Sequence, residues 1–75
     1  NNTEKRSYLN ANGVLKSSNV RRFDEVGNLI EDLDYNSIGD VVLRILYSYN
    51  QNQLDQITRF NESDEEFERI EYQRY

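Results

Sequence analysis

One stretch decides the fold of this chain, Phe23-Asp24-Glu25-Val26-Gly27-Asn28-Leu29-Ile30, in which an aromatic residue precedes a tight-turn signature and a short apolar run. A second copy follows as Tyr35-Asn36-Ser37-Ile38-Gly39-Asp40-Val41-Val42, and weaker copies begin at Tyr8 and Tyr49. The shared pattern is Phe or Tyr, Asp or Asn, two variable residues, Gly, one variable residue, and Leu or Val. We interpret each copy as one turn of a strand-turn-strand repeat.

The residue types at two positions of the pattern favour a turn. Asp or Asn at the start accepts hydrogen bonds from the backbone two residues on, and Gly three residues later supplies the positive φ that leads into the next strand. Asn12-Gly13 is also the strongest signal for a two-residue hairpin turn, because both residue types tolerate positive φ. The residues predicted to form the turns are Asp24, Gly27, Asn36, Gly39, Asn12 and Gly13.

Composition limits both the size and the chemistry of the protein. The 75 residues are 36% hydrophobic and include no Cys, Trp or Met. This composition suits one small domain and leaves little material for a two-sided core. Without Cys there are no disulfides and no thiolate metal ligands. No apolar run approaches the roughly 18 residues that a membrane-spanning helix needs.

Hydrophobic alternation indicates the strands. Val41–Tyr49 is the most apolar segment, with apolar residues on both sides of the alternation, and it is predicted to be a central strand covered on both faces. Earlier in the chain, alternation places Asp32 and Asp34 on a face exposed to water. Residues 14–23 are predicted to form a bulged or broken strand, because Ser17-Ser18-Asn19 lies in the middle.

The two ends of the chain are more polar. Residues 1–7 have no periodicity and are predicted to form a tail or the lead-in to an edge strand. Residues 61–66 look like a further turn without its glycine. Residues 67–75 suit a final strand or a helix capped by Asp64, and we favour the strand because the repeat predicts it. The chain stops at Tyr75, where another copy would open, so we expect a fragment of a longer protein.

These observations predict an all-β fold: an antiparallel β-meander, or hairpin-repeat sheet, of about five strands that belongs to a larger sheet or assembly. Residues 8–75 are expected to form this single module. The side chains expected to pack the sheet are Leu29, Leu33, Tyr35, Val41, Leu43, Ile45, Tyr47, Tyr49, Ile57 and Phe60.

Charge is distributed unevenly along the chain. The net charge is −5, but residues 1–22 contain five Lys or Arg and one Glu, whereas residues 23–75 contain four Arg and thirteen Asp or Glu. Such polarity can align neighbouring chains or repeats head to tail, although a solvated surface of mixed sign is the simpler interpretation. The acidic balance argues against nucleic-acid binding, because phosphate contacts need a basic surface.

The repeated pattern resembles a known family. Phe23–Leu29 is similar to the tyrosine-aspartate (YD) repeat of the RHS family, and Tyr47–Asn50 resembles the phrase that closes one unit and opens the next. The resemblance covers residues 22–60, and the sequence departs from it where Gln53 and Glu65 stand in place of Gly. It implies an extended sheet of β-hairpins in large bacterial proteins that are secreted or displayed at the cell surface.

The residues offer little chemistry for catalysis. The chain has no His and no Cys, so the usual nucleophile–base pairs and transition-metal sites are absent. We therefore predict no enzyme activity, no catalytic residues and no cofactor. The acids after Phe60 do not follow the twelve-residue calcium-loop pattern, and a solvated acidic face is preferred over a bound cation.

We expect a structural function, in which the module extends a sheet or docks onto a larger envelope assembly through its sheet edges or faces. One alternative is a small acidic accessory or immunity-type protein that binds a basic protein partner. Another is carbohydrate binding through exposed tyrosines. The acidic face of the first alternative comprises Glu62, Asp64, Glu65, Glu66 and Glu68.

Overall fold

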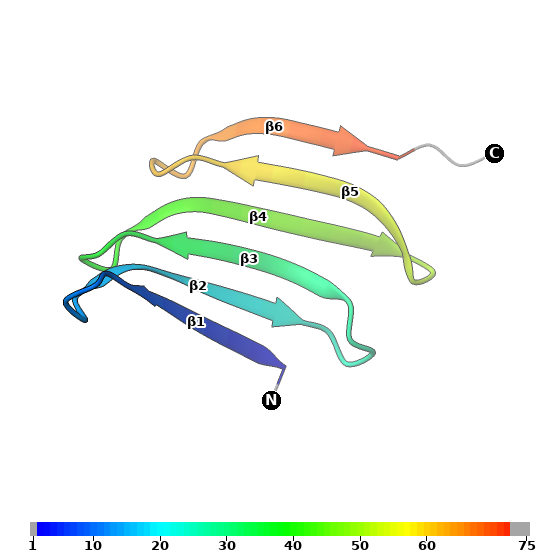
Figure 1. The fold of residues 1–75 in the computed structure, drawn as a ribbon. Coiled ribbons are helices and arrows are strands. Elements are labelled where there is room, and N and C mark those ends of the chain that lie inside the picture. Colours follow the sequence, from blue (N-terminus) through cyan, green and yellow to red (C-terminus); the bar gives the residue numbers. More distant parts are fainter. Residues whose placement is uncertain (1, 73–75) are drawn as a thin grey trace.

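The computed structural model describes residues 2–72, which form one open sheet of six strands (Figure 1). Each strand pairs antiparallel with the next one along the chain, so β1 and β6 form the two edges. The predicted all-β meander is confirmed, with six strands in place of about five. The strands are β1 (Thr3–Leu9), β2 (Leu15–Phe23), β3 (Leu29–Tyr35), β4 (Val41–Asn50), β5 (Gln53–Phe60) and β6 (Glu66–Glu71).

The additional strand comes from the N-terminal residues. Residues 3–7, predicted as a tail or a lead-in, form most of β1, which pairs with β2 from Thr3 opposite Arg22 to Leu9 opposite Leu15. Every residue of β1 is exposed. Its polar sequence suits an edge strand, because charged side chains at an open edge discourage indiscriminate strand pairing.

Four of the five connections between these strands use the same turn. An Asn or Asp side-chain oxygen accepts hydrogen bonds from the N–H groups two and four residues later. The N–H of that same residue donates to the carbonyl four residues later. The pairing register shifts beside each turn, as expected for a turn followed by a bulge. The turns begin at Asn10, Asp24, Asn36 and Asn61.

Positive φ angles mark the fourth residue of each of these turns. Gly13, Gly27 and Gly39 have φ of 78°, 94° and 92°, as the repeated pattern predicts. In the glycine-free turn this position is occupied by Asp64, at 61°, and not by Glu65. Asp is among the few residue types that tolerate this conformation, because its short polar side chain bonds locally.

The predictions for two turns need correction. Asn12 does not have positive φ: it donates its N–H to the Asn10 side chain at 2.9 Å, in a turn that is longer than the predicted two-residue hairpin. The two-residue turn connects β4 to β5 instead. There Gln51 and Asn52 both have positive φ, of 54° and 63°. This tighter turn leaves Gln53 inside β5, where the pattern predicted a turn glycine.

Two segments with competing predictions are continuous strands. β2 runs unbroken through Ser17-Ser18-Asn19, and its bulge lies near its start, where Lys16 has no partner in β1. At its other end the register shifts because Ile30 of β3 has no partner in β2. Residues 66–71 form β6, which confirms the strand preferred over a helix. Residues 73–75 of that predicted strand lie outside the described part of the chain.

The sheet has one layer. Among residues 2–72 no hydrophobic side chain is buried, and all ten side chains expected to pack the sheet are half-buried. β4 is an inner strand, as predicted, but no described segment covers its faces. The buried residues are instead polar, Asn19, Glu31 and Thr58. In a single layer the shielding comes from in-plane neighbours, and a polar group needs partners there to be buried without penalty.

Candidate functional site

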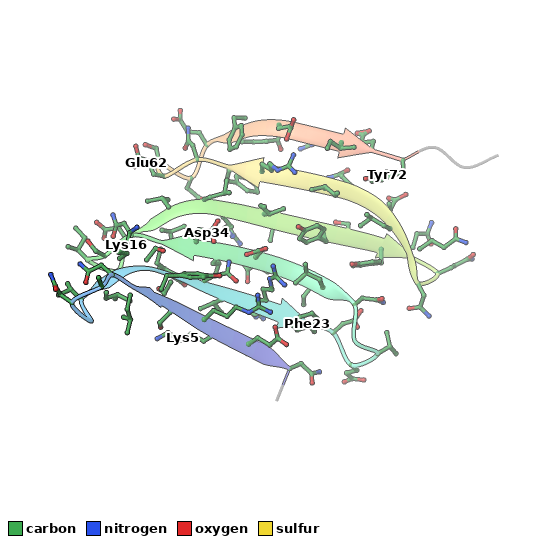
Figure 2. The ribbon with its side chains drawn as sticks, viewed as in Figure 1. Lys5, Lys16, Phe23, Asp34, Glu62 and Tyr72 are labelled. Carbon is green, nitrogen blue, oxygen red and sulfur yellow. The ribbon has the colours of Figure 1, made fainter. Side chains whose placement is uncertain are left out.

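The two faces of the sheet follow from strand alternation and register. Side chains project from both faces of the sheet (Figure 2). No segment within residues 2–72 is stacked on either face. We define face A by the aligned row Arg21, Asp32, Ile45, Arg59 and Glu68. We define face B by the aligned row Arg22, Glu31, Leu46, Thr58 and Arg69.

The apolar part of face A lies over β4, β5 and β6. Tyr47 stands opposite Ile57, which stands opposite Ile70. Burial among these neighbours raises the pKa of the Tyr47 phenol. Tyr49 lies on the same face, and its hydroxyl donates to the carbonyl of Leu29 at 2.7 Å. The apolar side chains thus pack along the sheet and join strands that are distant in sequence.

A polar cluster on face A joins β2 to β3. The Asn19 side-chain amide donates to Asp32 Oδ1 at 2.5 Å, to Asp34 Oδ1 at 2.7 Å and to the Leu33 carbonyl at 3.2 Å. The Asp32 side chain is 14% exposed and lies 3.7 Å from Arg21 Nε. The prediction that these two acids face water is therefore wrong, because the buried amide holds both carboxylates against the sheet.

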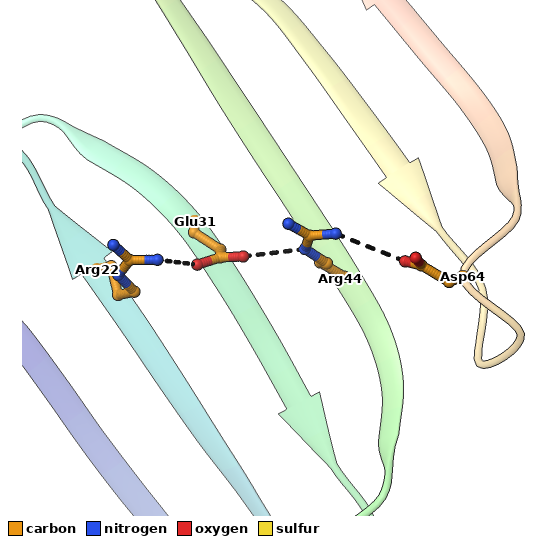
Figure 3. A network of polar contacts seen from close by, with 4 residues as sticks. All are labelled: Arg22, Glu31, Arg44 and Asp64. Carbon is orange, nitrogen blue, oxygen red and sulfur yellow. Dashed lines mark hydrogen bonds and ion pairs between the residues drawn. The ribbon is translucent and has the colours of Figure 1, made fainter.

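Face B holds a row of alternating charges (Figure 3). Arg22 Nη1 lies 2.7 Å from Glu31 Oε1, and Arg44 Nε lies 2.9 Å from Glu31 Oε2. Arg44 Nη1 lies 3.5 Å from Asp64 Oδ1, which extends the row to the β5–β6 turn. Each oxygen of Glu31 thus binds a different neighbouring strand, and one carboxylate ties β2, β3 and β4 together.

Electrostatics favour the charged form of this network. Burial acts to raise the pKa of Glu31, but hydrogen bonds and the charges of Arg44 and Arg22 outweigh it, so the pKa lies below its ordinary value of 4.5. The hydrogen bond to Glu31 likewise raises the pKa of Arg44. The Arg44 guanidinium also lies 5.5 Å from the centre of the Phe60 ring, a cation–π distance.

The structure spreads the predicted acidic face over the β5–β6 turn and β6. Asp64 pairs with Arg44, Glu66 Oε1 lies 2.5 Å from Arg69 Nη2, and Glu68 pairs with Arg59. Glu65 accepts a hydrogen bond from the Asn61 amide at 3.4 Å. Glu62 is exposed in the turn (Figure 2). Most of these acids are thus bound to side chains of the sheet itself.

Comparisons with known proteins assign no relatives to the chain. No protein-family model matches it, and no curated protein and no solved structure gives a significant match. Within residues 2–72 no three acidic side chains gather in a way that would hold a metal ion. The same residues form no helix with the length and apolar character needed to cross a membrane.

Two features of the surface were missed in the sequence. The Glu31 network was one, although a signal existed: alternation places Glu31 on the same face as Leu33, and Arg44 stands within the most apolar segment. The Asn19 cluster was the other, since Asn19 was taken as a strand breaker. A charged or amide side chain inside an alternating apolar pattern indicates a partner on the adjacent strand.

Proposed function

We propose that this chain is a structural β-module that extends a sheet by taking up further strands at its edges. The observation that supports this proposal is the uncovered single layer: within residues 2–72 no strand pairs with the outer side of β1 or of β6. Unpaired strand edges present rows of N–H and C=O groups that can accept another strand.

The edge strands also expose apolar side chains. Leu9 on β1 is 58% exposed, and Phe67 on β6 is 56% exposed. Tyr8, next to Leu9, is 49% exposed, and Tyr72, which directly follows β6, is 44% exposed. Pairing with a further strand would cover part of this surface, and each cross-strand apolar pair contributes about 0.2–1 kcal/mol. Edge pairing therefore supplies both backbone and side-chain contacts.

We further propose that the module belongs to a larger bacterial protein that is secreted or displayed at the cell surface. The resemblance of Phe23–Leu29 to the YD repeat supports this part of the proposal. The alternative of an acidic partner-binding face is less favoured, because Asp64, Glu66 and Glu68 already pair with arginines of the sheet. A basic partner would have to displace those arginines.

The experiment is thermal unfolding of residues 1–75 at several protein concentrations, monitored by circular dichroism. A module that needs neighbours is expected to unfold broadly and at low temperature, or to associate and melt higher as concentration rises. A matched variant, Ser7→Pro with Arg69→Pro, removes one N–H donor from each edge strand. It is expected to abolish the concentration dependence. A sharp, concentration-independent transition of a monomer would contradict the proposal.

A further inference from the structure

We propose that β6 of one copy pairs antiparallel with β1 of a second copy, in the register that places Glu71 opposite Lys5. This inference rests on the proposed function and names the strand that the edge takes up. Within residues 2–72 the two edges are the opposite ends of one meander, so the described part of each copy offers one edge of each kind. Their pairing is head to tail, and it repeats from copy to copy.

Strand directions permit this arrangement. Neighbouring strands of the meander are antiparallel, so with six described strands β6 runs antiparallel to β1. A second copy in the same orientation therefore presents its β1 antiparallel to β6 of the first copy. The meander continues across the junction without inverting either copy.

The backbone groups of the two edges also match. The Asn2 carbonyl accepts from Phe23 N–H and Asn10 N–H donates to the Val14 carbonyl, so the even-numbered residues of β1 face β2. Alternation then turns the backbone of Lys5 and Ser7 outward. Tyr72 N–H donates to the Asp55 carbonyl within the sheet, so alternation makes the outward-facing residues of β6 odd-numbered as well. They are Arg69, Glu71 and Phe67, the last at the bulge opposite Phe60.

Both sets of outward residues lie on face B. Lys5 pairs with Val20, and Val20 pairs with Leu33, which is two residues from Glu31 of face B. Arg69 of β6 belongs to the row that defines face B. Two copies can therefore hydrogen-bond edge to edge while face B of one continues into face B of the next. The allowed registers oppose odd residues with odd residues, and they differ from one another by steps of two.

Side chains select one of these registers. With Glu71 opposite Lys5, Arg69 stands opposite Ser7 and Phe67 stands opposite Leu9. This register makes an ion pair and an apolar pair, and it opposes no like charges directly. Opposite charges and apolar pairs across strands stabilise pairing, whereas like charges destabilise it.

The neighbouring registers lose these contacts. A shift of two residues in one direction places Arg69 opposite Lys5, which are both cationic. A shift of two residues in the other direction places Glu71 opposite Ser7 and Arg69 opposite Leu9. A shift of four places Glu68 opposite Glu4. The excess of basic residues in 1–22 and of acidic residues in 23–75 adds a longer-range attraction between the two edges.

Disulfide trapping tests the register, because the natural chain has no cysteine. Ser7→Cys chains are mixed with Arg69→Cys chains under mild oxidation. Hydrogen-bonded residues of antiparallel strands have Cα atoms about 5.5 Å apart, which a disulfide can bridge. Matched mixtures pair the Ser7→Cys chain with Phe67→Cys or with Glu71→Cys chains. We expect the first mixture to give at least about five times more cross-linked heterodimer than either control.

Equal yields in the three mixtures would overturn the register. Dominant linkage of Ser7→Cys chains to each other would show that β1 pairs with β1, which rejects head-to-tail pairing and leaves edge pairing standing. The absence of all cross-links would reject this inference. The proposed function is judged separately, by whether the unmodified chain is a cooperative, concentration-independent monomer.

A charge exchange gives a second measurement. Lys5→Glu and Glu71→Lys each place like charges at the junction and are expected to weaken association about two- to five-fold. The chain with both changes restores opposite charges and is expected to regain the original affinity, as measured by sedimentation equilibrium. If the double variant stays as weak as the single variants, these two residues are not opposite each other.

Discussion

Glu–Arg ion pairs in the middle of this sheet differ from those at its edge in their exposure and in the strands that they join. Glu31 in β3 binds arginines of two neighbouring strands, and its side chain is 9% exposed. Glu66 in β6 binds Arg69 of its own strand, and the two side chains are 37% and 49% exposed. The difference teaches that in a one-layer sheet the number of paired strands, rather than a second layer, determines how far a side chain is buried.

Replacing Glu31 should produce the largest effect. Glu31→Gln removes the charge that binds Arg22 and Arg44, and we expect the free energy of unfolding to fall by about 1–2 kcal/mol at pH 7. The matched control is Glu66→Gln, expected to change it by less than about 0.5 kcal/mol, because an exposed ion pair contributes little. Urea unfolding monitored by circular dichroism measures both. Equal losses would show that the middle and the edge do not differ.

Replacing a turn glycine should lower the free energy of unfolding by about 1 kcal/mol. This effect does not depend on whether the strand lies in the middle or at the edge of the sheet. Gly39 has φ of 92° and an added methyl group would meet no atom within 4 Å, so Gly39→Ala tests the backbone conformation alone. The control is Ser37→Ala in the same turn, which leaves the glycine unchanged. If Gly39→Ala unfolds at the same urea concentration as the natural chain, positive φ is not required there.

Acid should reduce the stability that the Glu31 ion pairs contribute in the middle of the sheet. We expect this to be the smallest of the three effects. The pKa of Glu31 is lowered in the folded chain, so its contribution is complete above the ordinary value of 4.5 and is lost as pH falls through the lowered folded value. The stability difference between the natural chain and Glu31→Gln should therefore shrink from pH 7 to pH 3. Urea unfolding at both pH values checks it, and a difference that grows in acid would contradict it.

The local architecture was predictable because its signals are short-range. Asp24 and Gly27 lie within one turn, and the hydrogen bonds that define it join atoms at most four residues apart. Alternation in Val41–Tyr49 identified an inner strand for the same reason. Most of β1 was missed because an exposed edge strand needs no apolar alternation, so its polar and exposed residues 3–7 resembled a tail.

The candidate surface was less predictable. Asn61 indicated its turn correctly, but the residue that replaces glycine was misplaced by one position: three residues after Asn61 the pattern reaches Asp64, which has the positive φ, and not Glu65. The acids of this region were predicted to form a solvated face, which the alternative function made available to a basic partner. In the folded sheet Asp64 lies beside Arg44 of β4 and Glu68 lies beside Arg59 of β5, and sequence distance concealed these two contacts. Glu66 pairs with Arg69 of its own strand.

The amino-acid sequence by itself determined the glycine turns, the strand periodicity and therefore the meander, because these depend on backbone preferences within a few residues. The tertiary structure alone decided the register between strands. That register placed Glu31 between Arg22 and Arg44 and brought Asp64 to Arg44, contacts that link residues 9, 13 and 20 positions apart. Ion pairs act over a few ångströms in space, and no local pattern specifies which residues meet at that distance.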